Sequence, residues 1–185
     1  MANIIIIHGT MGSPKGNWFP WLKSELEKLG HNVFVPKFPT PEGQNLDNWM
    51  KTFQDYKKYL DEDSILVGHS LGPSFILSIL ENLDRSIKSA YLVAGFTGLL
   101  DNKEFDTLNE SFVTKSFNWS KIKQNCGSFY VINSDDDPYV PLEKGKDLAD
   151  SLGTELIVLN NAGHINIDSG YNTFEFLLSK IKENQ

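Results

Sequence analysis

Short apolar runs, rich in β-branched residues, recur along the chain and are bounded by polar or turn-forming residues. Continuous runs of this kind are typical of strands that are buried on both faces of a sheet. They predict strands at 3–7, 32–35, 64–67, 90–93, 129–132 and 156–159. We therefore expect a sheet of about six strands.

The segments between these runs carry apolar residues three or four positions apart, which is the period of an amphipathic helix. The clearest stripes lie in residues 17–30 and 45–60, and helical patterns also begin at 71, 142 and 170. Strands that alternate with helices imply right-handed crossovers. The predicted fold class is therefore α/β, a three-layer α/β/α sandwich around a mainly parallel sheet.

One segment, residues 96–124, interrupts this alternation after the fourth predicted strand. A connection of this length usually has structure or a function of its own, and we expect one or two short helices over the carboxyl edge of the sheet. Its aromatic residues either complete the core or line a pocket, and Phe96 and Trp119 are the candidates for a pocket. We expect no large cap here, so a site beneath the segment would be shallow and open.

Composition narrows the classes of function. The chain of 185 residues is expected to form a single domain, 1–185. Its net charge of −7 argues against nucleic-acid binding, which needs clustered Lys and Arg. Cys126 is the only cysteine, which excludes an internal disulfide and a multi-thiolate metal site. The N-terminal apolar run is too short for a signal peptide or a membrane span, so we expect a cytoplasmic protein without membrane insertion.

The sequence Gly68-His69-Ser70-Leu71-Gly72 stands where the third predicted strand gives way to a helix. It fits G-x-S-x-G, the nucleophile elbow, in which small residues two positions away let backbone segments approach closely. A serine in this turn lies at a helix N-terminus, where unpaired N–H groups favour developing negative charge. Ser70 is therefore the predicted nucleophile.

A serine hydroxyl needs a base, which is expected to be a histidine oriented by a carboxylate. His31 is interpreted as a turn residue, and His69 adjoins the nucleophile, so its side chain points away from it. His8 ends the first predicted strand. His164 follows the last predicted strand in a turn-rich loop, which leaves it as the predicted base.

The fifth predicted strand is followed by Asp135, Asp136 and Asp137, any of which could reach a histidine on the neighbouring loop. Two of the three are interpreted as residues of a solvated turn. Pro138 favours an extended backbone at Asp137. The order serine, acid, histidine matches Ser70, Asp137 and His164, although the sequence separates Asp137 from Asp136 only weakly.

The first predicted strand leads into a loop with Gly9 and Gly12, where the backbone can approach a ligand closely. A backbone N–H here can complete an oxyanion hole with that of Leu71, and the donor is either Thr10 or Met11. His8 and Gly9 join the candidate pocket residues. Neither phosphate-binding glycine motif, G-x-G-x-x-G or G-x-x-x-x-G-K-[ST], is present, which argues against a nucleotide site.

With these features together, the chain resembles the α/β-hydrolase superfamily. Within it, the chain looks like the small cap-less serine hydrolases grouped as YdeN-like proteins, which are related to the retinoblastoma-binding serine hydrolase. The resemblance covers nearly the whole chain and is carried by W-x-x-W-L after the first loop, "LVGHSLG", "SDDDPYVP" and "NAGHINIDSGY". It implies a triad of Ser70, Asp137 and His164.

That resemblance implies a carboxylesterase-like enzyme that acts on a small acyl substrate through an acyl-enzyme, with no metal or organic cofactor. An open site favours short acyl chains. Thioester, peptide and lactone cleavage remain open at this stage. Because some relatives are discussed as binding partners of other proteins, the alternative hypothesis is a protein-interaction module on a hydrolase fold. The oligomeric state and any protein partner cannot be read from the sequence.

Overall fold

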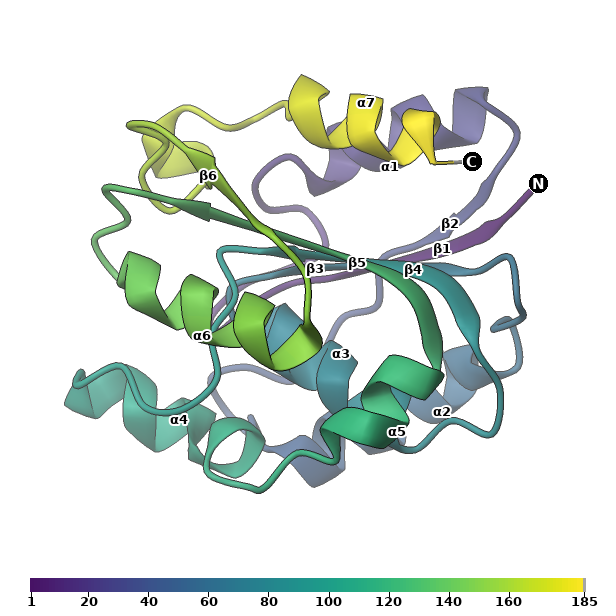
Figure 1. Ribbon diagram of the computed structural model, residues 1–185. Coiled ribbons are helices and arrows are strands. Elements are labelled where there is room, and N and C mark those ends of the chain that lie inside the picture. The colour runs from purple at the N-terminus through teal and green to yellow at the C-terminus, as the bar shows by residue number, and fades with distance from the viewer. Residues whose placement is uncertain (185) are drawn as a thin grey trace.

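A six-stranded sheet runs through the computed structural model, which describes residues 1–184 (Figure 1). All neighbouring strands are parallel, and their order is β2-β1-β3-β4-β5-β6. The strands are β1 (Asn3–Ile7), β2 (Asn32–Phe34), β3 (Ile65–His69), β4 (Ile87–Val93), β5 (Cys126–Ser134) and β6 (Leu156–Leu159). The parallel arrangement brings all carboxyl ends to one edge of the sheet.

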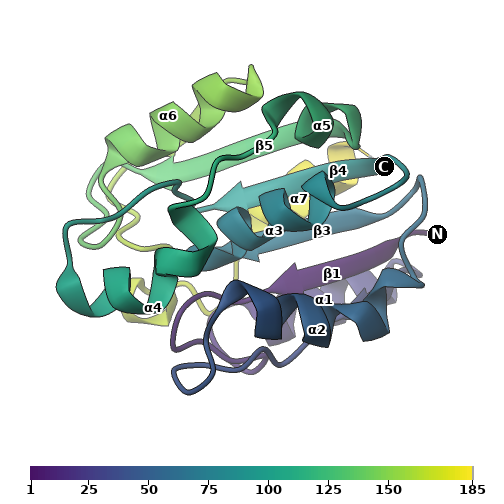
Figure 2. The same cartoon turned by 90° about the horizontal axis from the view of Figure 1, so that it is seen from below.

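Helices cover both faces of this sheet (Figures 1 and 2). On one face lie α1 (Phe19–Lys28) and α7 (Glu175–Glu183). On the other lie α2 (Leu46–Lys57), α3 (Leu71–Glu81), α4 (Lys103–Val113), α5 (Trp119–Gln124) and α6 (Leu142–Leu152). A single 3₁₀ turn, η1 (Ile167–Ser169), precedes α7 among the described residues. The predicted three-layer α/β/α sandwich is thereby confirmed.

Each face of the sheet buries its own apolar cluster, because side chains alternate between faces along a strand. In β1, Ile4 and Ile6 face α1 and α7, whereas Ile5 and Ile7 face α3. The helix α3 is apolar nearly all round and is buried from Leu71 to Leu80. It therefore lies at the centre of its layer, and α4 and α5 pack against it.

The predicted segment 96–124 contains two helices, α4 and α5, separated by a short loop. Asn102 caps α4 by accepting the N–H groups of Glu104 and Phe105, and Asn118 caps α5 in the same way through Lys121. Only α4 reaches the carboxyl edge of the sheet, whereas α5 packs beside α3 and α6 (Figure 2).

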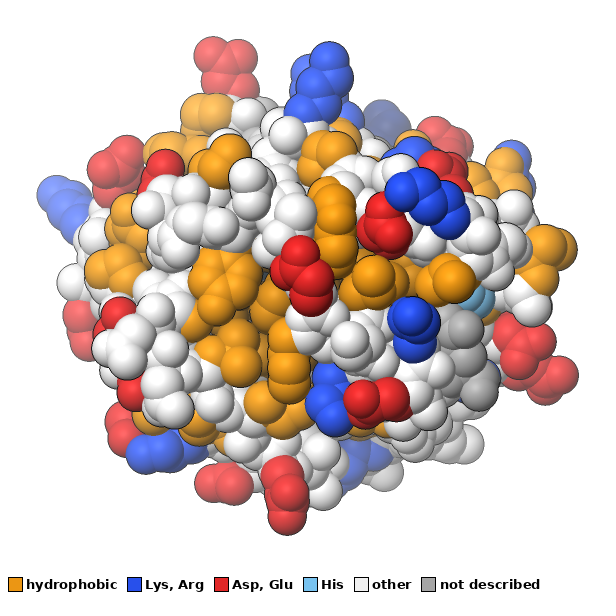
Figure 3. Space-filling view, turned by 90° about the horizontal axis from the view of Figure 1, so that it is seen from above, with side chains coloured by type: hydrophobic (Ala, Val, Ile, Leu, Met, Phe, Trp, Pro, Cys, Tyr) orange, Lys and Arg blue, Asp and Glu red, His pale blue; other side chains and the backbone are white. Residues whose placement is uncertain are grey.

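The face that carries α1 and α7 shows apolar side chains between charged ones (Figure 3). Tyr130, Ile157 and Phe176 are partly exposed there while they pack against the core beneath. Within residues 1–184, no helix has the length and apolar character needed to cross a membrane.

Candidate active site

Ser70 occupies a sharp turn between β3 and α3. Its backbone angles, φ 61° and ψ −107°, lie where residues other than glycine are rarely found. Its N–H donates to the carbonyl of Val93 at 2.9 Å, which anchors the turn to β4. A Cβ on Gly68 would lie 2.7 Å from the carbonyl carbon of Gly72, and one on Gly72 would lie 2.5 Å from the carbonyl oxygen of Ile7. Both glycines are required for the turn to close.

A cavity of about 360 Å³ opens above Ser70 at the carboxyl edge of the sheet. One part of its wall is apolar and the other carries polar side chains. The apolar part is formed by Met11, Leu100, Phe105, Tyr139 and Val140, and the polar part by Thr10, Asn17, His69, Asn109, His164, Asn166 and Asp168. Ser70, Gly9 and Gly12 complete the lining.

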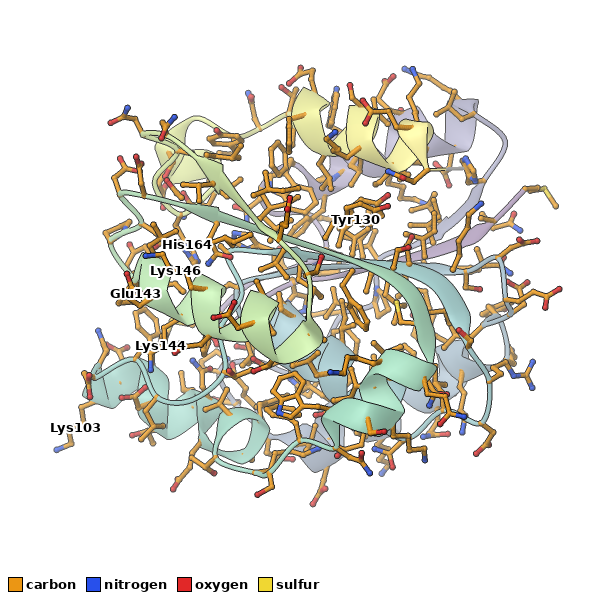
Figure 4. All side chains as sticks on the ribbon, viewed as in Figure 1. Lys103, Tyr130, Glu143, Lys144, Lys146 and His164 are labelled. Carbon is orange, nitrogen blue, oxygen red and sulfur yellow. The ribbon has the colours of Figure 1, made fainter. Side chains whose placement is uncertain are left out.

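His164 reaches this cavity from the loop after β6 (Figure 4). Its Nδ1 lies 2.7 Å from Oδ2 of Asp137, and their side chains are 10% and 0% exposed. The other carboxylate oxygen, Oδ1, accepts the N–H groups of Tyr139 and Val140 at 2.8 and 3.0 Å. Both oxygens of Asp137 are thus bound, so the carboxylate holds one orientation of the imidazole.

Nε2 of His164 has no hydrogen-bond partner within residues 1–184, and neither does the hydroxyl of Ser70. No hydrogen bond joins the two side chains in this part of the chain, although both line the cavity. Hydrogen bonds between catalytic groups are often long in the absence of substrate and tighten only in the substrate complex.

The backbone around His164, which we call the histidine loop (residues 161–165), is held by side chains along its whole length. Four consecutive N–H groups donate to oxygen atoms of side chains at 2.7–3.2 Å. The acceptors for residues 161 to 164, in chain order, are Asp135 Oδ1, Ser134 Oγ, Asp136 Oδ1 and Ser169 Oγ. The loop thereby keeps Asn161 and Ile165 at positive φ, 53° and 50°.

Two carbonyls of the histidine loop also accept hydrogen bonds from side chains. His69 Nε2 donates to the carbonyl of His164 at 2.9 Å, and Trp18 Nε1 donates to that of Ile165 at 3.0 Å. His69 is buried against the rings of Trp18 and Phe19, and this burial, followed by the electrostatic effect of His164, lowers its pKa to about 3. His69 is therefore neutral, and its Nε2–H supports the backbone of the histidine loop.

The three acids of the run Asp135–Asp137 have three different partners. We predicted that two of them belong to a solvated turn, and Asp135 and Asp136 are indeed exposed. Both nevertheless bind backbone N–H groups of the histidine loop, so the prediction was incomplete. Hydrogen bonds from the Ser134 hydroxyl and the Gly163 N–H lower the pKa of Asp136, which keeps it an acceptor.

Of the two predicted oxyanion donors in the loop after β1, Thr10 and Met11, only one has a free N–H within residues 1–184. The N–H of Met11 donates to Oγ1 of Thr40 at 2.7 Å and is therefore occupied. The N–H of Thr10 has no acceptor within residues 1–184. Leu71 is the first residue of α3, where the N–H has no carbonyl to bind in its own helix.

Three of the four predicted pocket residues do not line this cavity, and only Gly9 does. His8 is fully buried behind the loop, where Nδ1 donates to the carbonyl of Gly9 at 2.8 Å and Nε2 accepts the N–H of Phe38. Phe96 turns into the core beside α3, and Trp119, the first residue of α5, packs with Phe117 against that core. Segment 96–124 contributes Leu100, Phe105 and Asn109 instead. The cap residue Asn102, followed by an amphipathic stretch, is the sequence signal that locates α4.

Comparison with known proteins identifies the family of this chain. A family model described as serine hydrolase matches residues 4–183. The chain belongs to the serine hydrolase family. YdeN of Bacillus subtilis (strain 168) is 35% identical over 172 residues, covering 91% of this chain and 88% of that protein. Its crystal structure superimposes with a TM-score of 0.93 at 32% identity, covering 100% of this chain and 98% of the other.

Serine hydrolase RBBP9 of Rattus norvegicus is a more distant member, 25% identical over 163 residues, with 86% of this chain and 85% of that protein covered. Est1E from Butyrivibrio proteoclasticus shares the fold, with a TM-score of 0.71 at 17% identity over 98% of this chain and 86% of the other. The resemblance stated from the sequence is thereby confirmed.

Proposed function

We propose that this serine hydrolase cleaves esters of short acyl groups through Ser70, His164 and Asp137. The observation that carries the proposal is the Asp137–His164 hydrogen bond on the wall of the cavity that Ser70 also lines. Asp137 holds Nδ1–H of the imidazole, which leaves Nε2 as the lone-pair nitrogen that can accept a proton.

In the first half of the reaction, Nε2 of His164 takes the proton of Ser70 while Oγ attacks the ester carbonyl. The negative oxygen that forms is bound by the N–H groups of Leu71 and Thr10, both unpaired in the described chain. Collapse of this intermediate breaks the bond to the alcohol, which leaves with the proton from His164. The acyl group remains on Ser70.

In the second half, water replaces the alcohol. His164 removes a proton from water, the hydroxide oxygen attacks the acyl carbon, and Ser70 leaves with that proton as the carboxylic acid is released. The Asp137 carboxylate stabilises the imidazolium in both halves. Each cycle consumes one ester and one water and regenerates the enzyme.

The size of the cavity supports short acyl groups. Its volume of about 360 Å³ is near the lower end of the range for ligand pockets, roughly 300–1,000 Å³. The apolar wall of Leu100, Phe105 and Val140 suits a short hydrocarbon. Activity across p-nitrophenyl esters is therefore expected to be greatest for short chains and to fall as the chain lengthens.

The decisive test is Ser70→Ala, with labelling of the native protein by a fluorophosphonate. Loss of the nucleophile should lower turnover of p-nitrophenyl acetate by about 10⁴–10⁶ and abolish labelling. Ser120→Ala, on the exposed side of α5, is the control. Circular dichroism should show all three proteins folded alike. Turnover retained by Ser70→Ala would refute the proposal, and a native protein that neither labels nor turns over would favour the protein-interaction hypothesis.

A further inference from the structure

Asn109 is a polar side chain of α4 that the proposed reaction does not use. The residue is 2% exposed and lines the cavity above Ser70. Its Oδ1 accepts the hydroxyl of Thr10 at 2.5 Å and Nε2 of Gln44 at 3.0 Å. The side chain is thus fixed to the same loop that carries the proposed oxyanion donor.

The direction of this network is set by the carbonyl of Leu108. That carbonyl can only accept, so the group of Gln44 that contacts it is Nε2. Oε1 of Gln44 then accepts the hydroxyl of Thr40, and Oγ1 of Thr40 accepts the N–H of Met11. The atom of Asn109 that faces Nε2 of Gln44 is therefore the oxygen.

It follows that Nδ2 of Asn109 is turned away from the network. It has no hydrogen-bond partner within residues 1–184. In that part of the chain the fully enclosed side-chain polar atoms without a partner are Ser89 Oγ and Asn133 Oδ1. Nδ2 is not among them, so it opens to free space, and the space that Asn109 borders is the cavity.

We propose that Asn109 Nδ2 donates a hydrogen bond to an oxygen of the substrate other than its carbonyl oxygen. The inference rests on the proposed ester hydrolysis and adds a substrate class to it. Esters that carry an ether, hydroxyl or second carbonyl oxygen within reach of α4 are preferred over hydrocarbon esters of the same size. A buried donor that is left unpaired by a plain hydrocarbon makes that substrate bind less well.

The test compares pairs of esters that differ by one CH₂ replaced by oxygen. p-Nitrophenyl methoxyacetate against p-nitrophenyl butyrate examines the acyl group, and 2-methoxyethyl butyrate against butyl butyrate examines the alcohol. The variants are Asn109→Asp, which keeps the acceptor for Thr10 and Gln44, and Asn109→Leu, which removes the donor without adding charge. Thr107→Ala, on the exposed side of α4, is the control.

The quantity to compare is the preference, the ratio of kcat/KM for the oxygen ester to that for the hydrocarbon ester. Dividing the native preference by that of a variant cancels the intrinsic reactivity of each ester. For both Asn109 variants we expect this quotient to be about 10 in one of the two ester pairs. For Thr107→Ala we expect it to be about 1 in both pairs. The pair that responds shows whether the oxygen belongs to the acyl group or to the alcohol.

An unchanged preference in both pairs would overturn the inference, even if the variants lose activity. An equal loss on all four esters would do so too, because it would mean that Asn109 acts on the carbonyl oxygen or on the fold. A native protein that hydrolyses none of the esters would instead overturn the proposed function, and this inference with it. Thermal unfolding of each variant shows whether the fold is kept.

Discussion

The histidine loop and α4 border the same cavity but are attached to the molecule in different ways. The loop is tied by directional hydrogen bonds from side chains of β5, β3, η1 and the segment before α1. By contrast, α4 lies on α3 through the apolar side chains of Phe112 and Val113, and its polar link to the rest of the site is the contact of Asn109 with Thr10 and Gln44. Its outer end, at Lys103, points away from the molecule (Figure 4).

These two kinds of attachment suit two different tasks, the positioning of a catalytic base and the selection of substrates. A base has to hold its position to within a fraction of an ångström, and directional hydrogen bonds provide that restraint. A wall that selects substrates requires shape and a few placed polar groups, and apolar packing tolerates substitution there at moderate cost. We therefore expect substitutions of the side chains that hold the histidine loop to alter kcat, and substitutions in α4 to alter substrate selectivity.

The largest expected effect separates Asp137 from Asp136. Asp137→Asn replaces one carboxylate oxygen by a donor and loses the charge that stabilises the imidazolium, so kcat should fall by about 10⁴. Asp136→Asn keeps an acceptor for the Gly163 N–H and the Ser134 hydroxyl, so kcat should fall by less than about fivefold. Steady-state kinetics on p-nitrophenyl acetate measure both.

Removing the acceptor altogether tests whether Asp136 positions the base. Asp136→Ala should lower kcat by about tenfold with little change in KM, while Asp136→Asn restores most of the rate. A role confined to stability would lower the Tm of Asp136→Ala and leave kcat of the folded fraction unchanged. Equal kcat values for Asp136→Asn and Asp137→Asn would refute the assignment of the acid.

The sequence predicted those parts of the molecule that depend on local pattern. The predicted bounds of β1 and β6 agree with those of the structure, because their apolar runs are sharply bounded. β5 begins earlier than predicted, at Cys126, because Gly127 and Ser128 interrupt the apolar run and form strand only by pairing with Ile87–Ser89 of β4. Ser70, His164 and Asp137 stand at strand ends that the topology brings together.

Residues that act through distant contacts were not predicted. Asp135 and Asp136 bind N–H groups 26 and 27 positions further along the chain, which a run of three acids does not indicate. Asn109 lies on a helix whose pattern predicts burial, but its link to Thr10 spans ninety-nine positions. The misplaced pocket residues Phe96 and Trp119 show the same limit, because an aromatic residue can face either the core or a cavity.

A smaller effect is expected on the α4 side. The ring of Phe105 lies on the cavity wall, 5.8 Å from that of Tyr139. Phe105→Ala should deepen the cavity and shift the preferred acyl chain to a longer one, each further methylene adding up to about fourfold in kcat/KM, or about 0.8 kcal/mol. Turnover of the acetyl ester should change by less than about threefold. A chain-length series of p-nitrophenyl esters measures the shift.

The control for this series is Leu99→Ala, in the same segment but 43% exposed and away from the lining. It should leave the chain-length profile unchanged. A profile that is identical in native protein and Phe105→Ala, with both folded, would contradict the assignment of selectivity to this wall. A large loss on every ester would mean that the wall also positions the reacting groups.

The last expected effect is on the pH dependence of the unfolding free energy, and it arises from His69, which binds the histidine loop. Buried His69 has a pKa of about 3, against 6.5 in the unfolded chain, so between these values the unfolded state binds a proton that the folded state does not. Its contribution to stability is complete above pH 6.5 and is lost as the pH falls toward 3. His69→Gln cannot titrate but retains an N–H donor for the carbonyl of His164. Urea unfolding at pH 7, 6, 5 and 4 should therefore show a shallower loss of unfolding free energy for His69→Gln than for the native protein, and parallel curves would mean that His69 does not carry the acid sensitivity of the loop.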